Sequence, residues 1–412
     1  MRAASSRVHA PWRIAPALLA ALACQPKPAH VLDPTPIAIA GHAAASAPVE
    51  PEPAAPPAKR LGPLHRAAAF LFQPSPDAAT ATTVRGKLRL VAAGAAGERV
   101  EVGCKRGTTI YDRQGRERAL TLRPDAIAIA PDGSAIAART GARVAVLAMP
   151  DARALGTWDG EDPIWLADGT LALRHGCAWV AIAPQRPDTP AAALGEHCGT
   201  PLLSEPGTAR LWFAATDAPS VDATPVPARA LVGLSPGQPP LEQPLDAEGP
   251  VFEPRLSHDG SILCATTQRR GHALLQCRLR DGGVFEPVAQ DVVGHPVFAD
   301  DAPRLLVTVG DRETGQRDLH VVDFALKIVR RLGHIAHHRF DFLPGAERVV
   351  AYDGARGLVF ELDTGLVSPF GDEHDDWVAV LPDATAAGGD SFLATRLGQH
   401  CAELVRVQLP RR

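Results

Sequence analysis

The stretch DAIAIAPDGSAIAARTGARVAVLAMPDARALGTW, residues 125–158, decides the fold class of this chain of 412 residues. Apolar and polar residues alternate along it with a period of two, which is typical of half-buried β-strands. The Asp-Gly pair within it is a strong signal for a tight turn between antiparallel strands. The stretch therefore predicts a group of short antiparallel strands joined by tight turns.

The same pattern returns along the chain beyond residue 80 as an apolar run, a tight turn, a second run, a polar gap and two further runs. Successive turns are 36 to 53 residues apart, and this period favours a four-stranded unit over a helical repeat. We count eight units, or seven if the first or the weakly patterned fourth unit is incomplete. The turns lie at Gly97, Gly133, Gly169, Gly207, Gly260, Ala302, Gly345 and Ala384.

The segments PDGSAIAA, SHDGSILCATT and GHPVFADDAPRLLVTV resemble the WD40-like repeats of TolB-type bacterial β-propellers. The resemblance extends over residues 85–408. It implies an all-β ring of four-stranded blades that acts as a platform for partners. The Gly-His and Trp-Asp signature of eukaryotic WD40 blades is not kept in register, so we do not extend the resemblance to the partners of that group.

The last unit has three predicted strands, near residues 377–381, 391–397 and 402–409. Its fourth strand has to come from another part of the chain. We expect residues 68–73 (AAFLFQ) to supply it, because a strand from the N-terminal side closes the ring and leaves no exposed sheet edge.

Residues 1–23 have the pattern of a signal peptide, with three arginines before the ten-residue apolar stretch IAPALLAALA. That stretch is too short to span a bilayer. The last three residues of the stretch together with Cys24 read ALAC and resemble the lipobox of bacterial lipoproteins, which implies that Cys24 is lipidated. Gln25 is compatible with delivery to the outer membrane, on its periplasmic side or at the cell surface. An ordinary secretion signal beside a cysteine is the alternative.

Residues 24–63 form the predicted linker, with ten prolines between positions 26 and 63 and many alanines. This composition is typical of a solvated, semi-extended spacer. Such a spacer would hold the folded residues 64–412 clear of a lipid surface; a terminus without function is the alternative.

The charge balance excludes one class of partner. The chain has 42 Lys and Arg against 46 Asp and Glu, and it becomes more acidic once the arginines of the signal peptide are removed. A nucleic acid needs a basic surface that displaces its counterions, so we expect no nucleic-acid partner.

Six cysteines follow Cys24, an even number for a protein in an oxidising compartment. Two of them are equidistant from the turn at Arg270-Gly271, which places them opposite each other on antiparallel strands. A second pair shares one unit, and the third joins the first unit to the last. Buried free thiols are the alternative. The expected pairs are Cys264 with Cys277, Cys177 with Cys198, and Cys104 with Cys401.

Acidic and histidine-rich loops are expected on one face, where the chain enters the innermost strand of each unit. Carboxylates and imidazoles that converge there could hold a divalent cation or attract a cationic partner. Exposed loops are also polar when they have no function. The candidate binding rim is His334, His337, His338, Asp372, Glu373, His374, Asp375 and Asp376, with Asp341 nearby and further acids at Asp159, Glu161, Asp162, Asp246 and Glu248.

Two functions stay open at this stage. The sequence contains no GxSxG elbow, Walker loop, HExxH or paired CxxC motif. We therefore favour a monomeric, non-catalytic scaffold at the cell envelope, anchored by lipid, without a cofactor, that binds a protein or peptide. The alternative is a metal-dependent hydrolase or lyase with a divalent cation at the channel mouth, which requires three or four rim side chains to converge on one point.

Overall fold

A computed structural model of the chain describes most of the residues beyond position 59. They belong to one compact unit, Pro56–Arg412. The described residues are 60–66, 72–75, 78–94, 98–105, 107–186, 188–216, 226–247, 249–310, 314–335, 340–343, 345–353, 356–371, 377–382, 391–397 and 401–410.

The regular secondary structure of these residues consists entirely of β-strands, as the alternating sequence pattern predicts. No helix in the described part of the chain is long and apolar enough to cross a membrane. In chain order the strands are β1 (His65–Arg66), β2 (Gln73–Pro74), β3 (Thr80–Ala93), β4 (Arg99–Gly103), β5 (Thr108–Tyr111), β6 (Glu117–Leu120), β7 (Ala126–Ile129), β8 (Ala135–Thr140), β9 (Arg143–Ala148), β10 (Ala154–Asp159), β11 (Glu161–Trp165), β12 (Leu171–His175), β13 (Ala178–Ile182), β14 (Ala192–Glu196), β15 (Leu203–Ser204), β16 (Leu211–Thr216), β17 (Ala228–Leu234), β18 (Leu241–Pro244), β19 (Val251–Leu256), β20 (Ile262–Arg269), β21 (His272–Leu279), β22 (Glu286–Gln290), β23 (Val297–Phe298), β24 (Arg304–Gly310), β25 (Arg317–Asp323), β26 (Ile328–His334), β27 (Phe340–Phe342), β28 (Arg348–Tyr352), β29 (Gly357–Glu361), β30 (Leu366–Phe370), β31 (Trp377–Pro382), β32 (Ser391–Leu397) and β33 (Ala402–Gln408).

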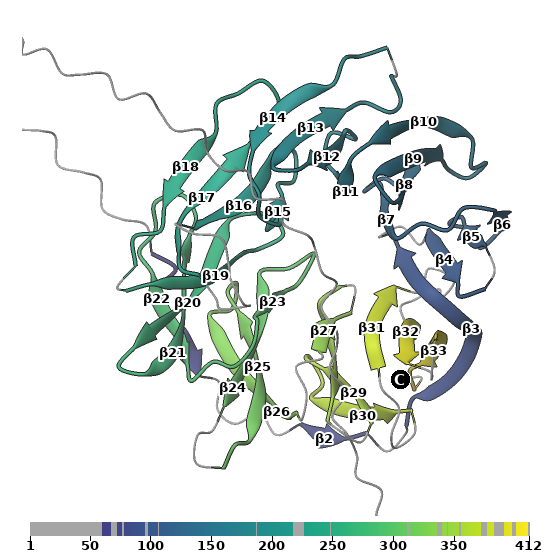
Figure 1. The fold of residues 1–412 in the computed structure, drawn as a ribbon. Coiled ribbons are helices and arrows are strands. Elements are labelled where there is room, and N and C mark those ends of the chain that lie inside the picture. The colour runs from purple at the N-terminus through teal and green to yellow at the C-terminus, as the bar shows by residue number, and fades with distance from the viewer. Residues whose placement is uncertain are drawn as a thin grey trace, which may run out of the picture. The chain divides into compact units, whose positions relative to one another are not determined.

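Strands that follow one another in the chain pair antiparallel, which gives a series of four-stranded meanders (Figure 1). The clearest are β7–β10 and β11–β14, each a separate sheet. The meanders β15–β18 and β19–β22 are linked into one sheet through the pairing of Ala228 with Val251. In Figure 1 the sheets succeed one another around a common centre, with the first strand of each meander on the inner side.

The predicted tight turns that the structure describes lie between the first and second strands of the meanders, whereas Gly97 and Ala384 lie outside the described residues. In the turn after β7, the Gly133 amide donates to the Ala130 carbonyl at 2.8 Å, and the Ser134 amide donates to the Asp132 carboxylate at 2.9 Å. Gly133 has φ = +69°, a conformation that favours glycine. The turns after β11 and β19 repeat the aspartate contact, from Thr170 and Ser261 respectively.

Apolar side chains pack between neighbouring sheets, so each sheet is buried on the faces that meet the previous and the next one. The buried Trp179 and Phe213 lie at one such interface, with ring centroids 5.5 Å apart. Leu306 and Phe360 lie in the cluster between the sheets of β23–β26 and β27–β30. This packing explains the period-2 pattern, because successive residues of one strand face different neighbouring sheets.

We predicted that residues 68–73 supply the fourth strand of the last unit, and this prediction is wrong for the residues that the structure describes. Gln73, the end of the predicted segment, pairs with Leu366 of β30 rather than with β33; residues 68–71 lie outside the described part. The strand beside β33 is β3, in which Thr80–Leu88 pairs with β33 and Leu88–Ala93 with β4. The apolar pattern of AAFLFQ has another cause. Phe72 packs against Phe360 in the cluster between the sheets of β23–β26 and β27–β30, and not beside β33.

The residues before and within β3 follow the outer edges of several sheets, and we call the described residues 60–66, 72–75 and 78–88 the N-terminal belt. The Gly62 amide donates to Glu286 of β22 at 3.1 Å. Then β1 adds to β26 and β2 adds to β30, both in parallel, before β3 adds to β33. Leu64, Phe72 and Ala79 of the belt pack against three successive apolar clusters.

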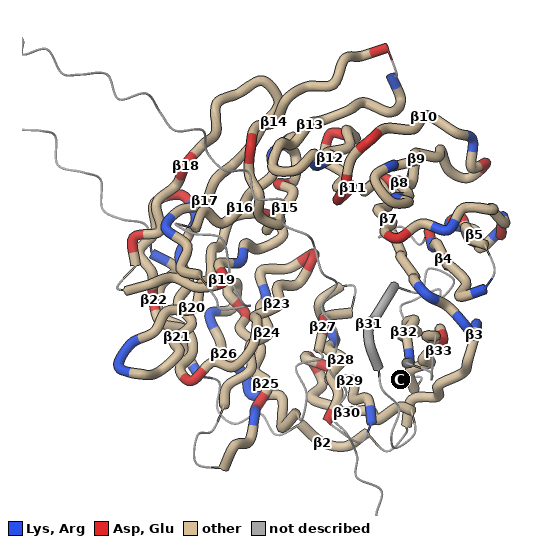
Figure 2. The backbone as a smooth tube through the Cα atoms, in the orientation of Figure 1, with Lys and Arg blue, Asp and Glu red and all other residues tan. Residues whose placement is uncertain are grey.

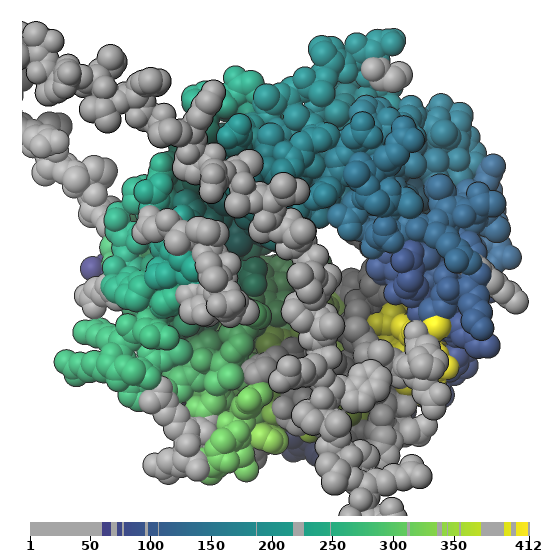
Figure 3. Space-filling view, viewed as in Figure 1, coloured from purple at the N-terminus to yellow at the C-terminus, as the bar shows by residue number. Residues whose placement is uncertain are grey.

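Three disulfides join the cysteines in the pairs that the sequence map gives. Cys264 and Cys277 are opposite each other on β20 and β21. Cys177 and Cys198 flank β13 and β14. The third bond joins Cys104, just after β4, to Cys401, just before β33. Figure 3 shows the strands at the C-terminal end, in yellow, against the strands that follow the belt, in blue.

Candidate functional site

Most of the predicted binding rim cannot be placed. His337, His338, Asp372, Glu373, His374, Asp375 and Asp376 lie outside the described residues, as do Glu248 and the lipidation candidate Cys24. His334 is described and ends β26 as an exposed residue opposite Asp318 of β25. Within the described residues, no three side chains of His, Cys, Asp or Glu are grouped so that they could hold a metal ion.

The acidic loop of residues 159–162, where β10 ends and β11 begins, is described completely, and arginines pair with its carboxylates. Figure 2 shows acidic positions in red at this junction. Asp162 lies 2.5 Å from the Arg174 guanidinium and 3.5 Å from that of Arg139. Glu161 lies 3.4 Å from Arg174. Because Arg139 belongs to β8 of the preceding sheet, these contacts join two neighbouring sheets. The carboxylates are therefore committed to ion pairs and do not form a vacant ligand set.

Asp341 is a described carboxylate whose pKa is well above its ordinary value. It lies in the middle of β27 and is accessible to solvent, although protein surrounds it on several sides. That burial, together with the negative charge of Asp300, raises the pKa of Asp341 to about 6, in spite of a hydrogen bond from the Phe342 amide. A carboxylate with such a pKa is a candidate for binding or proton transfer.

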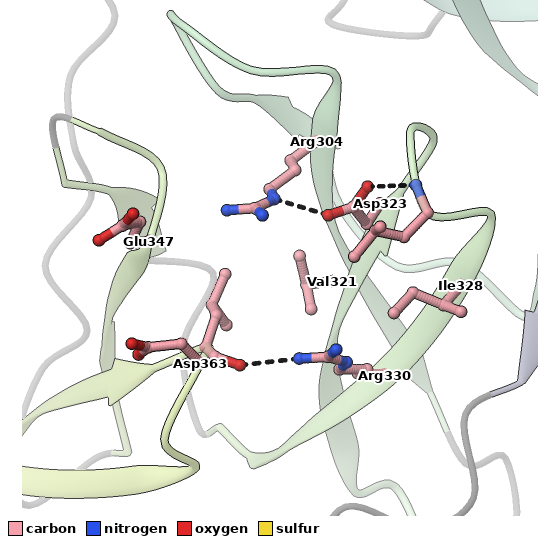
Figure 4. Close-up of a pocket in the computed structure, with 9 residues that line it drawn as sticks. Arg304, Val321, Asp323, Ile328, Arg330, Glu347 and Asp363 are labelled. Atoms are coloured by element: carbon pink, nitrogen blue, oxygen red, sulfur yellow. Dashed lines mark hydrogen bonds and ion pairs between the residues drawn. The ribbon is translucent and has the colours of Figure 1, made fainter.

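A small cavity of about 190 Å³ lies between the sheets of β23–β26 and β27–β30 (Figure 4). Its arginines hold the two sheets together. Arg304 pairs with Asp323 at 2.8 Å and donates to the Ala346 carbonyl at 2.6 Å, and Arg330 donates to the Leu362 carbonyl at 2.7 Å. We interpret this cavity as part of the contact between the sheets.

A cavity of about 770 Å³ lies where β3 passes from β33 to β4. At its base is Glu101, whose side chain is 1% exposed. Glu101 accepts hydrogen bonds from Arg99 Nε at 2.8 Å, Arg85 Nε at 3.1 Å and the Tyr111 hydroxyl at 3.3 Å. Burial raises the pKa of Tyr111 and keeps its hydroxyl protonated as a donor.

The wall of this cavity is formed by a bulge in β3. The pairing of β3 shifts register between Arg85 and Leu88, and Lys87 within the bulge has φ = +61°. Lys87 and Lys105 line the cavity, and neither has an ion-pair partner among the described residues.

Comparison with known proteins gives the fold. No protein-family model matches the sequence, and no curated protein sequence matches it either. The WD40 domain of SCAP from fission yeast is similar, with a TM-score of 0.50 and 9% identity over 80% of this chain and 98% of that chain. This chain has a β-propeller fold. Similar folds with lower TM-scores are an oligogalacturonate lyase in complex with manganese (0.49, 12% identity, 86% of this chain and 98% of that one) and the Dos1 propeller (0.48, 8% identity, 80% and 95%).

The sequence interpretation missed the cavity beside Glu101, although a signal was present. The run RVEVG at β4 places Glu101 between two valines of the propeller core, where an isolated carboxylate would be costly. A buried carboxylate in a strand requires partners, and Arg99 lies two residues away on the same side of β4. The second partner, Arg85, comes from β3 and is near only in the folded propeller.

Proposed function

We propose that this chain is an exported, lipid-anchored β-propeller that binds a protein or peptide partner at the cell envelope without catalysis. The proposal rests on the acidic loop between β10 and β11. Its carboxylates are paired with Arg139 and Arg174, so the loop presents a fixed polar surface that is suited to recognition of a partner. A scaffold needs such a patch, whereas a metal-dependent enzyme needs several uncommitted ligands at one point.

We also infer a ring of eight four-stranded blades closed through β3. Two observations support it. In the described residues each meander supplies four strands except β31–β33, to which Thr80–Leu88 of β3 adds the fourth. The continuation of β3 then pairs with β4 as the innermost strand of the first blade. Such closure would leave no sheet edge exposed at the junction of first and last blades.

The anchor is tested with Cys24→Ala in the full chain. We expect the wild-type protein to sediment with the membrane fraction and the variant to be soluble after export, because the lipid attachment is lost. An unlipidated wild type, read by mass spectrometry of its N-terminal peptide, would reject the anchor.

The binding role is tested by photo-crosslinking in the envelope. A crosslinking residue placed at His334, on the rim end of β26, should capture one reproducible partner. The matched control is Leu326, 60% exposed near the opposite end of the same strand, which should not capture it. The same partner at both positions, or none at His334 and at further rim positions, would contradict the proposed rim interface.

A metal-dependent hydrolase or lyase is the second candidate, and one observation favours it. Burial is the main cause of the raised pKa of Asp341, and the charge of Asp300 adds to it; a cation near these carboxylates would relieve both effects. Metal analysis of the full-length protein after dialysis tests this candidate. Stoichiometric metal in the wild type that is lost in Asp341→Asn would favour the metal-dependent enzyme. A metal-free wild type would reject this second candidate.

A further inference from the structure

The interface between the last and first sheets is packed differently from the others. Its apolar cluster consists of buried Leu88, Leu393 and Leu404, with Val91 packed against them. The neighbouring interface around Val350 and Phe392 holds eleven buried residues. The 770 Å³ cavity described above lies beside this junction and is lined, among the described residues, by β3, by the strands β4–β6 and by the segment between β4 and β5.

The charges around this cavity do not cancel. Arg85, Lys87 and Lys105 line it, and Arg99 supports its base through Glu101. Glu101 and Glu117 are the carboxylates among the described lining residues, so the three cationic side chains of the lining stand against two anionic ones. The described lining therefore has an excess of one positive charge in a chain whose formal net charge is −4.

The cationic groups differ in whether they already form ion pairs. Arg85 and Arg99 both bind Glu101, and Arg99 also stacks over the Tyr111 ring at 4.3 Å. Lys87 and Lys105 are exposed and make no ion pair in the described residues. The two lysines can therefore bind an added anion without losing an existing contact, over a base whose geometry is already set.

The wall that carries Lys105 is also fixed before any ligand arrives. Gly103 and Lys105 line the cavity on either side of Cys104, which is bonded to Cys401. The Cys104 amide donates to the Lys87 carbonyl at 2.8 Å, so the two lysines are carried by segments that are hydrogen-bonded to each other. A rigid pair of cations is suited to a compact ligand with two negative charges.

We propose that the cavity between β3 and the strands β4–β6 binds a small organic dianion through Lys87 and Lys105, with Arg85 at its base. The hydroxyl-bearing Thr109 also lines the cavity and is suited to polar groups of the ligand. Carboxylate and phosphate groups share the chemistry that this site recognises. The inference does not depend on the partner-binding function proposed above.

Titration calorimetry on the full-length protein at a slightly alkaline pH tests the proposal, with succinate, malate and inorganic phosphate as dianionic probes and glucose and choline as uncharged and cationic controls. We expect at least one dianionic probe to bind with one-to-one stoichiometry, and neither control to bind. Binding should weaken as ionic strength rises, because the lysines are exposed. A dicarboxylate preference over phosphate, or the reverse, identifies which anionic group the site takes.

The variant K87Q/K105Q should lower the association constant on the order of tenfold or more, since both ammonium groups are removed. Its free energy of unfolding should not fall, because neither lysine makes an ion pair with any residue that the structure describes. The matched control is K327Q, which also removes an exposed lysine at positive φ (+56°) but lies outside the cavity, and it should bind like the wild type. Absence of binding by every dianion, or equal binding by K87Q/K105Q and K327Q, would overturn the proposal.

Discussion

Cys104 and Cys401 are 297 positions apart in the chain, and a disulfide joins them with their Cα atoms 6.4 Å apart. The bond lies beside the point where β3 leaves β33 and joins β4. It therefore reinforces, by a covalent link, the same junction that β3 forms by hydrogen bonds. No other disulfide among the described residues spans so much of the sequence.

Removing this bond should cost more stability than removing a short-range one. We expect Cys104→Ala/Cys401→Ala to lower the free energy of unfolding by about 4–5 kcal/mol, because the bond restricts a long loop of the unfolded chain. The control is Cys177→Ala/Cys198→Ala. It removes a disulfide whose cysteines are 21 residues apart in sequence, and it should lower the free energy of unfolding by about 3 kcal/mol. Denaturant unfolding followed by tryptophan fluorescence measures both; equal losses would argue against a special role for the junction.

The N-terminal belt should contribute to stability through Phe72. Its ring meets Phe360 edge to face, with centroids 5.5 Å apart, and packs on the cluster between two sheets. We expect Phe72→Ala to lower the free energy of unfolding by about 1–3 kcal/mol, since the side chain is partly buried. Val84→Ala, on an exposed position of β3, should change it by less than about 0.5 kcal/mol. Indistinguishable unfolding midpoints would show that the belt is not anchored at Phe72.

Glu205 should stabilise the contact between the meanders β15–β18 and β19–β22 in a pH-dependent way. Its buried carboxylate pairs with Arg280, from the turn after β21, and lies 3.4 Å from Arg210. Burial alone would raise the pKa of Glu205, but the contact with Arg280 outweighs it and the pKa is lowered. The stabilisation is therefore complete above the ordinary value of 4.5 and is lost as the pH falls through the lowered pKa.

We therefore expect Glu205→Gln to lower the free energy of unfolding by about 3 kcal/mol at pH 7, with a difference that narrows in acid. Thermal unfolding at neutral pH and well below pH 4.5 measures this. Glu242→Gln is the control, because Glu242 is exposed and lies 4.0 Å from Arg229; it should change stability by less than about 1 kcal/mol. A pH-independent loss in Glu205→Gln would point to packing rather than charge.

Asp341 should act in the opposite direction. Because its pKa is raised to about 6, the proton on Asp341 stabilises the fold fully below pH 3.8, and this contribution is lost as the pH rises through 6. We expect Asp341→Asn to raise the melting temperature at pH 7.5 and to have little effect near pH 3.5. An NMR titration of the carboxyl carbon should give the raised pKa, and Asp300→Asn should lower it. An ordinary pKa would contradict this account.

Much of the fold was readable from local sequence. The alternation in residues 125–158 and the Asp-Gly turn predicted the strands β7–β10 and the turn at Gly133, because side-chain periodicity and positive φ are local properties. The equal distances of Cys264 and Cys277 from the turn at Gly271 predicted their opposition, since antiparallel register follows from the turn.

What lies between sheets was decided only by tertiary structure. The apolar run ending at Gln73 has the pattern of a closing strand, yet Phe72 packs on Phe360, and β3 takes the place beside β33. Glu101 could be recognised in the sequence as an unusual buried charge, but its partner Arg85 and the cavity with Lys87 and Lys105 could not. Periodicity determines which face of a strand is apolar. The packing of whole sheets decides which distant segment contacts that face and where a cavity is left between segments.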